Sequence, residues 1–133
     1  MDFRFTPEQE ALRKEFEDFC EEEAKRAPEW WGYSLAPQEE TDEGWVYHRS
    51  VVEKVAKKGW LCLPWPKEYG GQGHGPIEQL IFQEVTAYHR VPAVPILFMQ
   101  VAAAILYHGT EEQKKEWLPK IARAEIWWAE CLS

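Results

Sequence analysis

Apolar residues recur at spacings of three and four along much of this chain, which is the period of an amphipathic helix. The first such stretch opens with Thr6-Pro7-Glu8-Gln9. Thr6 can cap a helix, Pro7 suits its first position, and Gln9 completes a capping box. The pattern predicts about five helices, placed at about residues 7–27, 43–58, 76–90, 95–108 and 111–123.

The predicted helix over about residues 95–108 is apolar nearly all round, and Gln100 interrupts its apolar run. A helix of this kind is either buried or crosses a membrane. It is shorter than the ~20 residues that a membrane span needs. We therefore expect a central core helix and no membrane span.

The end of the chain changes character after the last predicted helix. Thr110 and Gln113 form a second capping box, which starts that helix. The hydrophobic run 126–133 that follows predicts a strand. The expected fold is thus an all-α helical bundle, residues 1–124, with the start of a β-strand of a further domain at residues 125–133. This change at the last residues leads us to expect part of a larger protein.

A segment rich in aromatic residues, 60–73, separates the second and third predicted helices. Its two prolines and three glycines exclude a regular helix, and its apolar residues predict a buried, ordered loop. The run Gly70-Gly71-Gln72-Gly73 could be a phosphate-binding loop. It lacks the Lys-Ser/Thr pair and the preceding parallel strand of such loops, so a tight turn is the better interpretation.

The charge balance and the cysteines exclude several classes of protein. The chain has 15 basic and 23 acidic residues, a net charge of −8, and its basic residues are scattered, which argues against nucleic-acid binding. Cys20, Cys62 and Cys131 lie far apart, with no C-x-x-C pair. This favours neither a disulfide framework nor a zinc site, and it predicts a cytoplasmic protein.

Two polar residues on apolar faces have more than one interpretation. Glu84 could have a raised pKa and do acid–base work, or it could be a paired structural carboxylate. His48 is interpreted as a half-buried packing residue and not as a ligand. The run Glu21-Glu22-Glu23 predicts a solvated helix face.

Three motifs resemble those of the flavin-dependent acyl-CoA dehydrogenases. They are Phe5-Thr6-Pro7-Glu8-Gln9 at the start, Gly59-Trp60 through Pro66-Lys67-Glu68-Tyr69-Gly70-Gly71-Gln72-Gly73, and His108-Gly109-Thr110-Glu111-Glu112-Gln113-Lys114. Their order and spacing are similar to the N-terminal third of the family, and the resemblance spans nearly the whole chain.

The resemblance implies an α-helical N-terminal domain that a β-domain and a second helical domain follow. In the family, FAD and an acyl-CoA thioester meet between the three domains. The implied reaction is α,β-desaturation: a carboxylate removes the α-proton and the flavin accepts the β-hydride. The implied partners are the acyl-CoA substrate, an acceptor like the electron-transfer flavoprotein, and further subunits in a homo- or hetero-oligomer.

The resemblance also implies site residues at the start of the predicted fourth helix and in the segment after the fifth. Leu132 and Ser133 match the opening of the flavin-binding motif, and Glu130 stands just before it. The start of the fourth helix lines the acyl pocket in the family. By position this implicates Ala93, Ile96, Leu97 and Gln100. The family's catalytic glutamate belongs to its C-terminal domain, so no catalytic residue is assigned and Glu84 is favoured as a structural carboxylate.

Two hypotheses of different kinds follow. The first is the N-terminal domain of an FAD-dependent acyl-CoA dehydrogenase, which alone neither holds FAD tightly nor turns over acyl-CoA. The second is a non-catalytic helical interaction module that assembles with a partner flavoprotein subunit. In that case Trp127, Trp128 and other exposed aromatic residues would form the contact surface.

Overall fold

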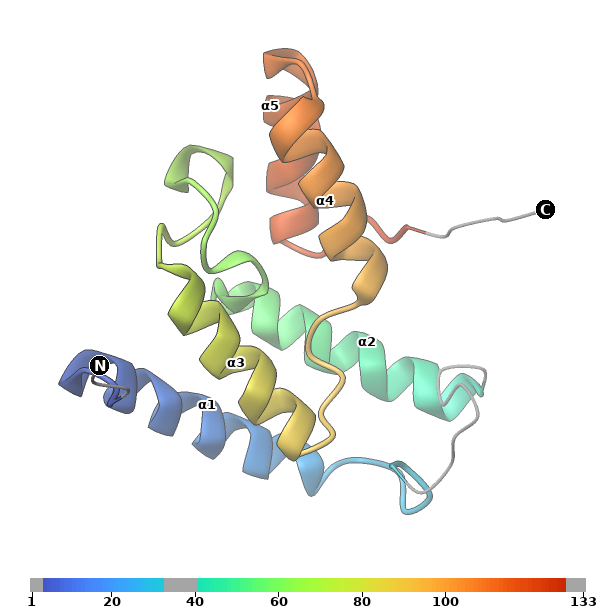
Figure 1. The fold of residues 1–133 in the computed structure, drawn as a ribbon. Helices are drawn as coiled ribbons and strands as arrows, with labels where there is room; N and C mark the ends of the chain where they lie inside the picture. Colours follow the sequence, from blue (N-terminus) through green and yellow to red (C-terminus); the bar gives the residue numbers. More distant parts are fainter. Residues whose placement is uncertain (1–3, 33–40, 129–133) are drawn as a thin grey trace. The chain divides into compact units, whose positions relative to one another are not determined.

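The computed structural model describes residues 4–32 and 41–128, except for the side chains of Ile96 and Leu97 (Figure 1). Within these residues the chain forms five α-helices and no strand, which confirms the all-α prediction. The helices are α1 (Pro7–Ala24), α2 (Asp42–Lys57), α3 (Pro76–Tyr88), α4 (Ile96–His108) and α5 (Glu111–Ala122), with short 3-10 turns η2 (Trp60–Cys62) and η3 (Lys67–Tyr69). Most of the predicted C-terminal strand, residues 129–133, lies outside the described part.

The chain divides into two compact units, and the division falls within α2. The first unit comprises Met1–Val51 and Gly75–Pro92, and the second comprises Val52–His74 and Ala93–Ser133. Each unit therefore combines two stretches that are distant in the sequence.

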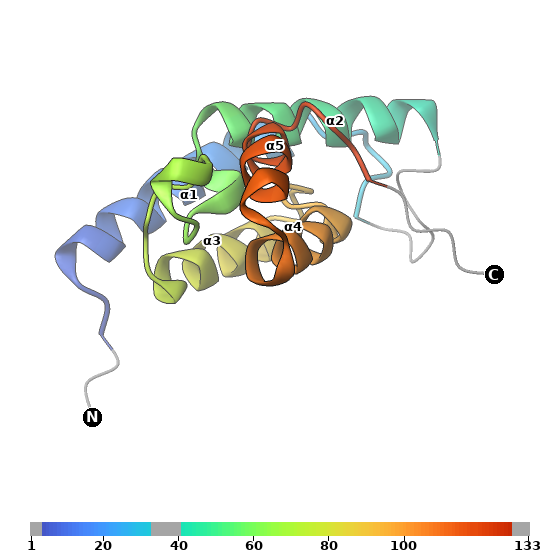
Figure 2. The same ribbon diagram turned by 90° about the horizontal axis from the view of Figure 1, so that it is seen from above.

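Helices α1 and α3 form the centre of the first unit and lie side by side (Figures 1 and 2). The ring of Phe16 is fully buried and meets Phe82 edge to face, with ring centroids 4.9 Å apart. The Gln9 side-chain amide donates to Glu78 at 2.9 Å, which joins the first turns of the two helices. The predicted capping box is present, since Thr6 and Gln9 exchange hydrogen bonds.

Helix α1 buries one carboxylate that the sequence placed in solvent. Glu23 is only 3% exposed and pairs with Arg26 at 3.0 Å. The Tyr47 hydroxyl donates to the Glu23 carbonyl at 3.1 Å. The prediction of a wholly solvated Glu21-Glu22-Glu23 face is therefore wrong at its third residue, because the first part of α2 covers the end of α1.

The second unit contains the aromatic loop that connects α2 to the third helix. Trp60, Leu63 and Trp65 are buried, as predicted for an ordered loop. The amides of Gly71 and Gly73 donate to carbonyls within the same loop. The backbone donors that a phosphate would need are thus used by the turn, as the tight-turn interpretation requires.

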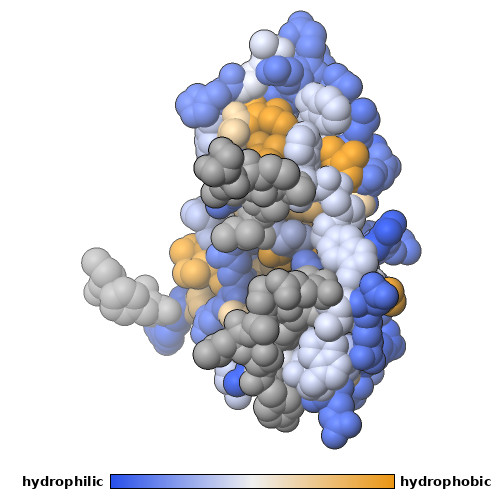
Figure 3. All heavy atoms as spheres, turned by 90° about the vertical axis from the view of Figure 1, so that its right-hand side faces the viewer, coloured by the Kyte–Doolittle hydropathy of each residue, from blue (hydrophilic) through white to orange (hydrophobic). Residues whose placement is uncertain are grey.

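Helix α4 differs from the predicted core helix. Among its described side chains, Phe98 and Ala102 are buried, whereas Gln100 and Tyr107 are exposed. The expectation of a central core helix is wrong here, because only α5 packs extensively against α4 among the described elements. Figure 3 shows apolar areas, in orange, that remain uncovered on one face of the molecule.

Candidate functional site

The expected acyl-binding residues lie at the start of α4 and just before it. Ala93 is buried, with 1% of its surface exposed. Ile96 and Leu97 occupy the first turn of α4, and their side chains lie outside the described part. Gln100 is exposed, so its amide group is available to a ligand.

The expected flavin-contacting residues Glu130, Leu132 and Ser133 also lie outside the described residues. The structure does describe how the chain leaves α5 towards them. Ala124 adopts a positive φ of 53° just after the helix, and the Glu125 amide donates to the Lys120 carbonyl at 3.0 Å.

A bidentate ion pair stabilises this exit turn. The Arg123 guanidinium donates to both carboxylate oxygens of Glu125, at 2.6 and 3.0 Å. These hydrogen bonds lower the pKa of the Glu125 carboxyl. Paired donors of this kind also fix the relative orientation of the two side chains.

Two tryptophans follow the turn and contact α4 and α5 of the second unit. Trp127 meets Phe98 of α4 with ring centroids 5.0 Å apart, and Trp128 meets Trp117 of α5 at 5.9 Å. Both pairs are edge to face. The chain that approaches the expected flavin residues therefore touches the helix that carries the expected acyl residues.

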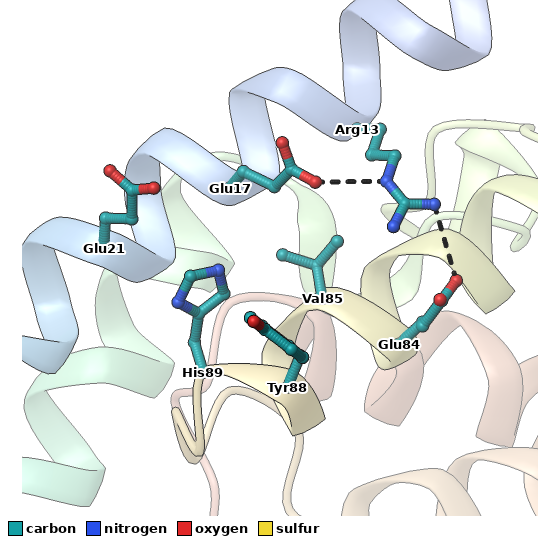
Figure 4. Close-up of a pocket in the computed structure, with 7 residues that line it drawn as sticks. All are labelled: Arg13, Glu17, Glu21, Glu84, Val85, Tyr88 and His89. Carbon is teal, nitrogen blue, oxygen red and sulfur yellow. Dashed lines mark hydrogen bonds and ion pairs between the residues drawn. The ribbon is translucent and has the colours of Figure 1, made fainter.

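A hollow of about 350 Å³ lies in the first unit, on α1 and α3 (Figure 4). Its lining comprises Arg13, Glu17, Glu21, Glu84, Val85, Tyr88 and His89. Figure 4 shows the Arg13 guanidinium between two of the carboxylates. It contacts Glu17 at 3.1 Å and Glu84 at 3.6 Å.

This cluster decides between the two interpretations of Glu84. Its side chain is 57% exposed and has an arginine partner, so it is a paired carboxylate. Arg13 was missed by the sequence reasoning as a partner of Glu84. The spacing of four residues between Arg13 and Glu17 could have predicted that ion pair, because such residues are neighbours on a helix. The sequence near Arg13 contains no comparable signal for the contact with Glu84 on α3.

The other candidates have structural surroundings. His48 is buried at 8% exposure, deeper than the half-buried position predicted, and packs against Trp45. Cys20 and Cys62 are free and buried, and burial raises the pKa of each thiol to about 12. In the described part of the chain, no three His, Cys, Asp or Glu residues form a group that could hold a metal ion. Nor is any helix there long and apolar enough to cross a membrane.

Comparison with known proteins gives a consistent result over nearly the whole chain. The family model for the acyl-CoA dehydrogenase N-terminal domain matches residues 6–125. Acyl-CoA dehydrogenase FadE26 of Mycobacterium tuberculosis is 37% identical over 95% of this chain and 31% of its own length. The short-chain-specific acyl-CoA dehydrogenase of Clostridium acetobutylicum is 33% identical over 94% of this chain and 31% of its own length.

Solved structures agree with this assignment. A chain of the ChsE4-ChsE5 complex from Mycobacterium tuberculosis matches with a TM-score of 0.72 and 35% identity, over 95% of this chain and 30% of that one. A chain of the Tcur3481-Tcur3483 steroid ACAD matches with a TM-score of 0.68 and 28% identity, over 95% and 31%. The chain thus spans less than a third of the length of these relatives. It belongs to the acyl-CoA dehydrogenase family, whose N-terminal domain it matches.

Proposed function

We propose that this chain is the N-terminal domain of an FAD-dependent acyl-CoA dehydrogenase, in which it forms part of the acyl pocket and one edge of the flavin site. The observation that carries the proposal is the match of the family model over residues 6–125. The contact between Trp127 and Phe98 supports it, because it brings the segment next to the expected flavin residues onto the expected acyl helix. Residues 125–133 then begin the following β-domain.

The residues of this chain have binding roles in the proposal. Ala93, Ile96 and Leu97 give the acyl chain an apolar wall, which favours burial of its methylene groups. Gln100 can donate or accept a hydrogen bond at the edge of that wall. The substrate is an acyl-CoA thioester, and no residue of this chain takes its α-proton.

On the flavin side, Leu132 and Ser133 supply contacts, the latter through its hydroxyl group, and Glu130 precedes them. FAD, when bound, supplies the hydride acceptor. One described group near these residues can donate a hydrogen bond to a further partner. The Trp128 indole N–H is shielded from solvent and has no acceptor among the described residues. Because a buried N–H without an acceptor is unfavourable, we infer that a group outside the described residues supplies one.

The proposal extends to the electron acceptor, the oligomeric state and the cellular compartment of the intact enzyme. We propose that the intact enzyme passes electrons to an acceptor like the electron-transfer flavoprotein, and that it works as a homo- or hetero-oligomer. Both matched structures, the ChsE4-ChsE5 complex and the Tcur3481-Tcur3483 steroid ACAD, combine two components, which favours a hetero-oligomer. The free thiols of Cys20 and Cys62 fit a reducing compartment, and we propose the cytoplasm.

A chimera tests the proposal. Residues 1–133 would replace the matching segment of FadE26, and the purified protein would be assayed for bound FAD by its visible spectrum and for acyl-CoA-dependent dye reduction. We expect the chimera to hold FAD and reduce the dye, and the isolated chain to do neither. A folded chimera without FAD, or dye reduction by the isolated chain, would contradict the proposal.

The second candidate function, assembly as a separate subunit, is favoured by the matched ChsE4-ChsE5 complex and Tcur3481-Tcur3483 steroid ACAD, since each combines two components. Mixing the isolated chain with a polypeptide that comprises the remainder of FadE26 tests it. A stable complex by light scattering, with FAD bound, would support a module that completes a partner flavoprotein. If only the covalent chimera binds FAD, the single-chain domain is the better description.

A further inference from the structure

Trp127 and Trp128 are neighbours in the chain, yet they contact side chains of two different helices. Trp127 packs on Phe98 of α4 at an interplanar angle of 68°, and Trp128 packs on Trp117 of α5 at 65°. Edge-to-face pairs are specific in both distance and angle, because the positive edge of one ring meets the negative face of the other. The side chains of two consecutive residues therefore pack against rings on two different helices.

Both partner rings are themselves restrained. Phe98 is 1% exposed, and a side chain packed this closely has little freedom to move. Trp117 has the Lys120 ammonium group 4.8 Å from its ring centroid, in a cation–π arrangement. The contacts thus connect the chain to a buried ring on α4 and to a half-buried ring on α5.

The turn before the two tryptophans fixes the direction in which the chain arrives. Ala124 has a positive φ and the Glu125 amide donates to the Lys120 carbonyl, so α5 ends in a turn at this point. The bidentate pair of Arg123 with Glu125 closes that turn. Five residues, 124–128, therefore connect α5 to the expected flavin segment through a turn and two aromatic contacts.

Phe98 also lies within the expected acyl segment, between Leu97 and Gln100. A shift of this part of α4 would move the ring on which Trp127 packs. Conversely, a shift of the chain at Trp127 would disturb the packing of Phe98. The contact is a direct physical link between the acyl side and the flavin side of the proposed site.

We propose that the pairs Phe98–Trp127 and Trp117–Trp128 are positioning contacts, which set where the flavin-contacting residues stand relative to the acyl-binding part of α4. This inference rests on the proposed function. Trp127 and Trp128 act through the chain that follows them, so they are positioning residues and not catalytic ones. Loss of either contact weakens FAD binding, because the following residues must then be ordered when the flavin binds.

The test uses the FadE26 chimera with Trp127→Leu and, separately, Trp117→Leu. FAD dissociation constants would be measured by quenching of flavin fluorescence, beside kcat and KM for acyl-CoA. Each substitution should weaken FAD binding about two- to tenfold, the range expected from one aromatic pair. Trp127→Phe keeps an aromatic edge and should restore most of the affinity. Tyr107→Leu is the matched control, since Tyr107 lies on α4 and is 75% exposed.

The outcomes separate positioning from general stability. If Trp127→Leu lowers the melting temperature but leaves FAD affinity equal to that of Tyr107→Leu, the inference is overturned. If the unsubstituted chimera binds no FAD, the proposed function fails. The two aromatic contacts are then tested in the isolated 133-residue chain. There, Trp117→Leu should speed hydrogen exchange at the Glu125 amide, which donates to the Lys120 carbonyl in the exit turn, at least about twofold relative to Tyr107→Leu. Equal rates would overturn the inference.

Discussion

Replacing Phe16 with alanine should destabilise the first unit by a large fraction of its total stability. The Phe16 side chain is 0% exposed and contacts Phe82 edge to face at 4.9 Å. Removing a buried phenylalanine costs about 3–5 kcal/mol, because the transfer free energy is lost and a cavity remains. A domain of this size has a stability of about 5–15 kcal/mol, so the substitution should remove about a third or more of it unless the chain is unusually stable.

Urea unfolding of the 133-residue chain, followed by tryptophan fluorescence and circular dichroism, measures this effect. A double-mutant cycle with Phe82→Ala isolates the ring contact, for which we expect a coupling of about 0.5–1.5 kcal/mol. Tyr88→Ala on α3 is the control: Tyr88 is 81% exposed, and its replacement should change stability by no more than about 0.5 kcal/mol. A cost below about 1 kcal/mol for Phe16→Ala, similar to that of the control, would refute this account of the α1–α3 core.

Three further measurements follow from single residues. Thr110→Ala removes the cap of α5 and should cost about 1 kcal/mol in urea unfolding; no change would mean that the cap contributes nothing. The hydrogen bond from Tyr69, with the nearby Lys114, lowers the pKa of the Glu111 carboxyl from its ordinary value. The ionised carboxylate therefore stabilises the folded chain above the ordinary carboxyl pKa, and this stabilisation is lost as the pH falls through the lowered pKa. Glu111→Gln should therefore reduce, without abolishing, the fall in melting temperature as the pH is lowered, and an unchanged pH dependence would contradict this. Burial raises the pKa of the Cys62 thiol to about 12, so iodoacetamide at pH 8 should label it only in urea, and rapid labelling of the folded chain would show an open loop.

The local elements of this protein could be predicted from the sequence because their causes are local. Both capping boxes, at Thr6 and Thr110, join residues three positions apart, and both are present. The end of α1 was less certain from sequence: the helix stops at Ala24 and not near residue 27. There Arg26 turns back to Glu23, a pairing that depends on the burial of that carboxylate.

The candidate site was predictable only in part. The motifs indicated the family, which the comparisons confirm. The roles of Ala93, Ile96, Leu97 and Gln100, and those of Glu130, Leu132 and Ser133, stay predictions. Residue type alone could not show that Gln100 is exposed, because exposure depends on which elements lie across from α4.

The sequence by itself determined the helices, their caps and the ordered aromatic loop, because each depends on interactions between residues close in the chain. Only the tertiary structure decided which side chains are covered and which distant residues meet. It paired Arg13 with Glu84, buried Glu23 and left much of α4 uncovered. The physical reason is that helical periodicity specifies which residues share a face, whereas burial depends on the element that packs against that face.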